Sequence, residues 1–170
     1  MAFETLLQFI QALAVVAGLI FAIVQVRQFR RERERNSALE LLHSFQTPEF
    51  ARAMVVTYAL PDGLSRDETA QRLGEDFYLV YAMANTWESL GILVFRGEIG
   101  LDMVGDFFSG PILLSWERLR NYFHAERQAT GRETIGEWFE WLRDRLVECE
   151  ADTPAVPAHI EHRNWKPATK

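Results

Sequence analysis

The chain has little of the chemistry that most enzymes and nucleic-acid-binding proteins need. It contains one cysteine, Cys149, which excludes an internal disulfide and a thiolate metal cluster and suits a reducing cytoplasm. It has no Walker A loop, no G-x-G-x-x-G loop and no G-x-S-x-G turn. Residues 36–170 carry 13 Lys or Arg against 21 Asp or Glu, a net charge of −8, so we expect no nucleic-acid partner. Sustained period-2 alternation is also missing, which argues against a sheet.

What the sequence does have is a long apolar run near its N-terminus. Residues 6–26 contain no charged side chain and only three glutamines. A helix of this length rises about 31 Å, close to the hydrocarbon core of a bilayer at about 30 Å. The run therefore predicts a transmembrane helix. A cleaved signal peptide is disfavoured because its positive charge precedes the apolar region, whereas here the arginines follow it. A buried core helix is disfavoured because so long a stretch without charge is rare in soluble folds.

The orientation of this span follows from the basic residues behind it, which are Arg27, Arg30, Arg31, Arg33 and Arg35. Positive flanking charge stays in the cytoplasm, so we expect a single-pass protein of the plasma (bacterial inner) membrane with its N-terminus outside. The lipid bilayer is then the first partner. The expected parts are an anchor with a basic juxtamembrane segment at 1–35, a cytoplasmic helical domain at 36–150 and an extended, proline-containing tail at 151–170.

One face of the predicted span is suited to packing against another helix. Its small and polar members are Gln8, Gln11, Ala14, Gly18, Ala22 and Gln25, which recur at helical spacing. Small residues let helix backbones approach closely, and glutamines can hydrogen-bond across the contact. We therefore expect a homo-oligomer or contact with other membrane-protein subunits. A water-filled pore is disfavoured because Val15, Gly18 and Ala22 provide no polar lining near the midplane.

The predicted cytoplasmic part consists of helices separated by capping and turn signals. The expected helices begin at Thr47-Pro48-Glu49, at the capping box Ser65–Glu68, at Asp76, at Leu101, at Ile112 after Ser109-Gly110-Pro111, and at a second capping box, Thr134–Glu137. The fold class is therefore all-α, with one transmembrane helix continuous, to about Phe45, with a bundle of about five or six helices.

Several large aromatic residues are candidates either for the core or for an interaction surface of this domain. They are Trp87, Phe107, Phe108, Trp116, Trp138, Trp141 and Trp165. We expect Trp165 to anchor the tail onto the helices, because it is the only large aromatic side chain of a proline-containing segment.

No residues in the sequence point to a catalytic, cofactor or metal site. Glu40 and His43 have the E-x-x-H spacing of dimetal bundles, but these need that pair twice. His159 and His162 lie in the tail without enough further ligands for a closed site.

Carboxylates in apolar surroundings are the remaining candidates for catalysis. Glu88 lies in an apolar helix, where we expect an ion pair with an arginine such as Arg118 or Arg120 rather than acid catalysis. Asp102 and Asp106 are explained by the dipole at a helix N-terminus.

The order of these segments resembles a bacterial family known as a domain of unknown function, whose members join one N-terminal span to a helical cytoplasmic domain. The resemblance rests on four blocks: Leu42–Phe50, Trp87–Phe95, Gly110–Trp116 and Gly136–Leu142. It implies a topology and brings no catalytic residues.

The leading hypothesis is a non-enzymatic, membrane-anchored assembly or accessory protein that self-associates or joins a larger membrane complex. One alternative is an oligomeric membrane sensor or channel-like effector. The other is a membrane-tethered enzyme that uses buried carboxylates such as Glu88 and Asp106.

Overall fold

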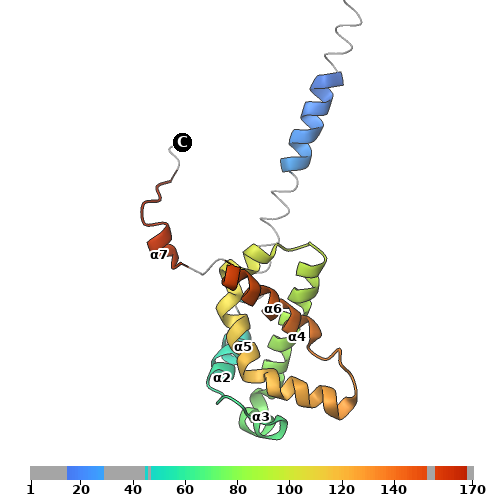
Figure 1. Cartoon of the computed structure of the whole chain (residues 1–170), viewed down its shortest axis with the longest axis vertical. Helices are drawn as coiled ribbons and strands as arrows, with labels where there is room; N and C mark the ends of the chain where they lie inside the picture. The colour runs from blue at the N-terminus through green and yellow to red at the C-terminus, as the bar shows by residue number, and fades with distance from the viewer. Residues whose placement is uncertain (1–14, 29–44, 46, 153–155, 168–170) are drawn as a thin grey trace, which may run out of the picture. The chain divides into compact units, whose positions relative to one another are not determined.

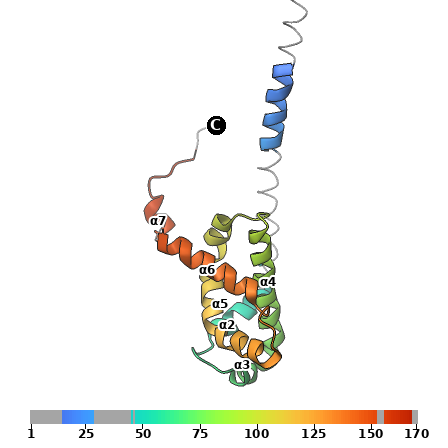
Figure 2. The same ribbon diagram turned by 45° about the vertical axis from the view of Figure 1, so that its right-hand side comes forward.

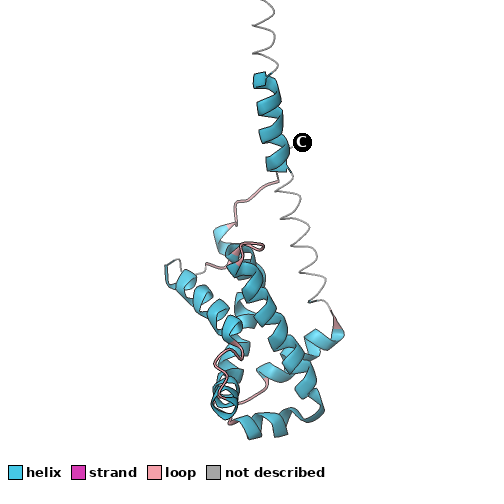
Figure 3. Cartoon of the chain, turned by 90° about the vertical axis from the view of Figure 1, so that its right-hand side faces the viewer, coloured by secondary structure: helices cyan, strands magenta, loops and turns pink. Residues whose placement is uncertain are grey.

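The computed structural model describes residues 15–28, 45, 47–152 and 156–167, and all regular elements among them are helical (Figures 1 and 3). The all-α prediction is therefore confirmed for the described part of the chain. The chain divides into two units, Met1–Gln46 and Thr47–Lys170.

In the first unit, residues 15–28 form a helix on which every residue is exposed. This helix lies within the apolar run at 6–26 and extends two residues past it, while the earlier part of the run lies outside the described residues. Within the described ranges, no helix combines the length and the apolar character that crossing a membrane requires. The predicted continuation to about Phe45 passes through residues 29–44, which also lie outside the described part.

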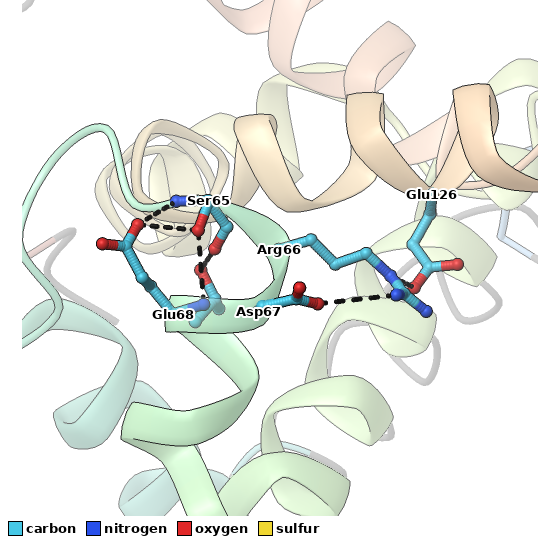
Figure 4. A network of polar contacts seen from close by, with 6 residues as sticks. Ser65, Arg66, Asp67, Glu68 and Glu126 are labelled. Atoms are coloured by element: carbon cyan, nitrogen blue, oxygen red, sulfur yellow. Dashed lines mark hydrogen bonds and ion pairs between the residues drawn. The ribbon is translucent and has the colours of Figure 1, made fainter.

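The second unit begins with two short helices whose caps are those that the sequence predicts. Helix α2 (Pro48–Tyr58) starts at Thr47, whose Oγ1 accepts a hydrogen bond from the Phe50 N–H at 3.1 Å. Helix α3 (Arg66–Leu73) starts with the expected capping box. Glu68 accepts from the Ser65 N–H at 2.9 Å, and the Glu68 N–H donates to Ser65 Oγ at 3.3 Å (Figure 4). A 3-10 turn, η1 (Gly74–Asp76), leads into the next helix.

The core is built by α4 (Phe77–Phe95), α5 (Leu101–Thr130) and α6 (Glu137–Asp152), with α2 packed against the first two. Helix α6 crosses α4 and α5 (Figure 2). Trp87 of α4 contacts Phe50 of α2 and Phe108 of α5, with ring centroids 5.4 and 5.8 Å apart. Trp116 of α5 contacts Phe139 of α6 at 5.1 Å. These aromatic contacts join all four helices around one apolar interior.

The prediction of two helices separated at Ser109-Gly110-Pro111 is wrong, because a single helix, α5, runs through this segment. It is continuous over 30 residues with Pro111 in its interior. Proline lacks the N–H that would bond to the carbonyl four residues earlier, which usually breaks or kinks a helix. Here the buried positions continue past the proline on one stripe, formed by Val104, Phe108, Ile112, Trp116, Leu119 and Phe123. Packing along both halves therefore outweighs the local signal. The helix ends, as predicted, at Gly131 with a left-handed φ of 67°.

The start of α6 also differs from the prediction of a capping box at Thr134. The helix begins at Glu137, and Gly136 before it has a φ of 69°. That left-handed conformation does not fit the helical turn that the capping box would need here. A side chain at Gly136 would also have its Cβ 2.8 Å from the Phe123 ring, so only glycine allows this close approach.

The tail contains a short helix, α7 (Ala158–Glu161), where the sequence predicts an extended chain. A hydrogen bond of 2.8 Å from the Trp165 N–H to the His162 carbonyl closes a turn after it.

Candidate functional site

The residues of the proposed packing face that the structure describes are Gly18, Ala22 and Gln25, all exposed on the helix of residues 15–28. A Cβ added at Gly18 would meet no other atom within 4 Å, so the position is open in a single chain. Arg27 is exposed on the same helix. The other predicted members, which lie outside the described residues, are Gln8, Gln11, Ala14, Arg30, Arg31, Arg33 and Arg35.

The same helix exposes an unusual amount of apolar surface. Eight large hydrophobic side chains are between 49% and 63% exposed: Val15, Val16, Leu19, Ile20, Phe21, Ile23, Val24 and Val26. Consecutive members such as Leu19, Ile20 and Phe21 point in different directions, so the apolar surface surrounds the helix. A large exposed apolar surface marks contact with a membrane or with another protein.

The candidate aromatic residues separate into core and surface groups. Trp87, Phe108 and Trp116 are at most 8% exposed and belong to the core. Phe107 is 47% exposed on α5. Trp165 is 71% exposed, so the expectation that it anchors the tail on the helices is not met within the chain.

Trp138 and Trp141 are half-buried on α6 and form a surface cluster with Phe95, which ends α4. The Phe95 ring lies 4.9 Å from Trp138 and 5.9 Å from Trp141, and the two indoles are 5.9 Å apart. Arg145 extends over Trp141 with its guanidinium carbon 5.9 Å from the ring centre. We call Phe95, Trp138 and Trp141 the aromatic patch. Sequence reasoning missed Phe95 as a surface residue; its position beside the apolar stripe of α4 is the signal that could have found it.

Glu88 is placed by the close approach of α4 and α6. A Cβ at Gly91, one helical turn further along α4, would lie 2.4 Å from the Trp138 carbonyl oxygen, so the two backbones almost touch there. Glu88 therefore reaches the N-terminus of α6, where its carboxylate accepts a hydrogen bond from the Phe139 N–H at 2.7 Å. Gly136 precedes this helix and has no side chain to cap it, so Glu88 supplies the missing acceptor from another helix.

In this position the pKa of Glu88 is shifted. The predicted ion pair between Glu88 and Arg118 or Arg120 is wrong. Burial raises the pKa of Glu88 above its ordinary value, although hydrogen bonds from the Phe139 and Trp138 N–H groups act in the opposite direction. Neither expected arginine pairs with it, because Arg118 pairs with Asp62 and Arg120 with Glu117. Capping of α6 gives this half-buried carboxylate a structural role.

Two further polar networks join helices. Arg127 is 9% exposed, and it donates to the Ile135 carbonyl at 2.8 Å and pairs with Glu140 at 2.5 Å, which fixes the turn between α5 and α6. Arg66 pairs with Glu126 at 2.5 Å and ties α3 to α5 (Figure 4). Tyr122 lies beside the same Glu126 carboxylate. Burial and this neighbouring carboxylate raise the pKa of the Tyr122 hydroxyl to about 12.

The candidate metal-ligating and acidic residues do not come together among the described residues. No group of three or more His, Cys, Asp or Glu side chains there has the geometry to hold a metal ion. His162 lies 3.8 Å from Glu161 on the exposed tail, and Asp106 is exposed on α5. Glu40 and His43 lie outside the described part.

Comparison with known families gives a match over most of the chain. The model described as "Domain of unknown function (DUF4760)" matches residues 12–146. The matched region includes the described part of the apolar helix, Glu88 and the aromatic patch, whereas the tail follows it. No curated protein and no solved structure matches the chain.

Proposed function

Because the chain belongs to the DUF4760 family of domains of unknown function, we propose its function from its own residues: a membrane-anchored, non-enzymatic assembly or accessory protein. It acts through helix–helix self-association or as a subunit of a larger membrane complex. Its domain lies on the cytoplasmic side of the plasma membrane.

The exposed apolar surface of residues 15–28 carries this proposal. A helix that is hydrophobic on all sides needs apolar surroundings, and no side chain of this helix is buried within the chain. The sequence extends the apolar run upstream to residue 6, which supplies the length of a bilayer span. The arginines from Arg27 onward favour the orientation with the domain inside.

The small residues of the predicted packing face support self-association. Hydrophobic burial does not drive contact between two helices in lipid, so close packing at small residues and interhelical hydrogen bonds provide most of the attraction. Gly18 and Ala22 lie one turn apart on an open surface, and Gln25 follows Ala22 by three residues. These three positions form a face along which a second span can approach closely.

Substitution of this face tests the proposal. Gly18→Leu combined with Ala22→Leu should dissociate the complex of the full-length protein in mild detergent, because bulky side chains separate the helix backbones. The matched control is Val16→Leu with Ile20→Leu on the opposite face, which should leave the complex intact. Sedimentation of the two variants measures the difference. A complex unchanged by both pairs contradicts packing through this face.

A further inference from the structure

We propose that the aromatic patch of one copy of the chain binds the C-terminal tail of a second copy, with Trp165 as the inserted side chain. The inference rests on the proposed self-association and names the contact that joins the cytoplasmic domains. It gives a function to two surfaces that the fold leaves exposed.

The patch has the composition of a binding hot spot. Phe95 is 62% exposed although its ring contacts both Trp138 and Trp141, so a further aromatic side chain can pack against it. Tryptophan and arginine are enriched at the centres of protein interfaces, and Arg145 over Trp141 completes this combination. Aromatic rings also gain from edge-to-face contacts beyond the area that they bury.

The tail presents a matching side chain. Trp165 is 71% exposed, and the turn closed by its hydrogen bond to the His162 carbonyl gives it a defined position after α7. Pro157 and Pro167 restrict the backbone on both sides of the turn. A restricted segment loses less conformational entropy on binding, which favours its use as a ligand.

The domain and the tail carry net charges of opposite sign. Residues 47–152 carry ten Arg and 19 Asp or Glu, a net charge of −9. Residues 153–170 carry three Lys or Arg and one Glu, a net charge of +2, and two of these cations, Arg163 and Lys166, flank Trp165. Close to the patch residues in sequence, the exposed carboxylates of Glu98 and Glu137 alternate with the cations Arg96 and Arg145. The positive tail is therefore matched by the net negative charge of the domain as a whole.

The described part of the tail leaves the patch of its own domain open, so a tail from another copy can reach it. Trp165 is 71% exposed and Phe95 is 62% exposed. Two α6 helices related by a two-fold axis and running antiparallel bring each tail to the other copy's patch. Such a contact is isologous, so both patches are filled in a closed dimer.

Photo-crosslinking tests the inference on the full-length protein. Benzoyl-phenylalanine replaces Trp165, and chains labelled with ¹⁵N are mixed with unlabelled chains before irradiation. We expect crosslinks from position 165 to peptides containing Phe95, Trp138 or Trp141, with the two peptides carrying different labels. Crosslinks only between peptides of the same label mean that the tail binds its own domain, and crosslinks only to lipid mean that it binds the membrane. Either result overturns the inference, as does the absence of crosslinks to the patch.

Substitution provides a second measurement. Trp165→Ala should weaken association of the full-length protein about thirtyfold, the size typical of a tryptophan hot spot. The control is Tyr78→Ala, because Tyr78 is 79% exposed and lies outside the patch, and it should leave the dissociation constant unchanged. One outcome overturns this inference alone: the oligomer dissociates with Gly18→Leu and Ala22→Leu but is unaffected by Trp165→Ala. A wild-type monomer overturns the proposed self-association as well.

Discussion

Replacement of Glu88 tests whether its carboxylate is the cap of α6. Its Oε2 atom accepts the Phe139 N–H at 2.7 Å, and Phe139 is fully buried. Glu88→Ala leaves this donor without its acceptor and should lower the free energy of unfolding at pH 7 by about 1–3 kcal/mol. Glu88→Gln keeps an acceptor oxygen at the same place, so its cost should be smaller, below about 1 kcal/mol.

The pH dependence of these variants separates a buried carboxylate from an exposed one. Burial raises the pKa of Glu88 above its ordinary value of 4.5, so the folded protein retains this proton to a higher pH than the unfolded chain does. The stability that this raised pKa contributes is fully present below the unfolded pKa and is lost as pH rises through the folded pKa, whereas the hydrogen bond from the Phe139 N–H remains. Glutamine cannot ionise, so Glu88→Gln should gain stability relative to the wild type as pH rises from about 4.5 toward neutrality.

Denaturant unfolding of the full-length protein in mild detergent, followed by tryptophan fluorescence between pH 4 and 7.5, measures both effects. The expected order of stability at pH 7 places Glu88→Ala clearly below Glu88→Gln. Equal stability of the two variants would refute the capping role. A difference between wild type and Glu88→Gln that stays constant with pH would refute the effect of burial on the pKa.

Two further predictions concern the orientation of the chain and the contact between α4 and α6. Cys149 is the only cysteine and is exposed, so a membrane-impermeant maleimide should label it in inside-out vesicles and not in right-side-out vesicles; the reverse pattern would contradict a cytoplasmic domain. Gly91→Ala should lower the free energy of unfolding by about 1–3 kcal/mol, because its Cβ would meet the Trp138 carbonyl, and urea unfolding measures this change. Gly105→Ala is the control: its Cβ would make an ordinary 3.7 Å contact with Leu146, so a loss of equal size there would contradict the explanation.

The features that the sequence predicted correctly depend on neighbouring residues. Thr47 caps α2, and Ser65 and Glu68 form a capping box, because each donor and acceptor are three residues apart. Gly131 ends α5 because glycine adopts the left-handed conformation without strain. Such signals need no knowledge of the rest of the fold.

The features that could not be predicted depend on contacts between distant segments. Pro111 lies inside α5 because the packing of both halves of the helix outweighs a missing hydrogen bond. Glu88 caps a helix 51 residues later in the chain, a partner that no local pattern indicates. The aromatic patch likewise combines Phe95 with two tryptophans from α6, so it exists only once the helices have packed.

The mass and composition of the particle extracted from native membranes in mild detergent test the central claim most directly. The account predicts that the chain is recovered from the membrane fraction, either as a complex of identical copies or in a fixed ratio with other membrane subunits. Recovery as a monomer, or from the fraction that contains no membrane, would contradict it.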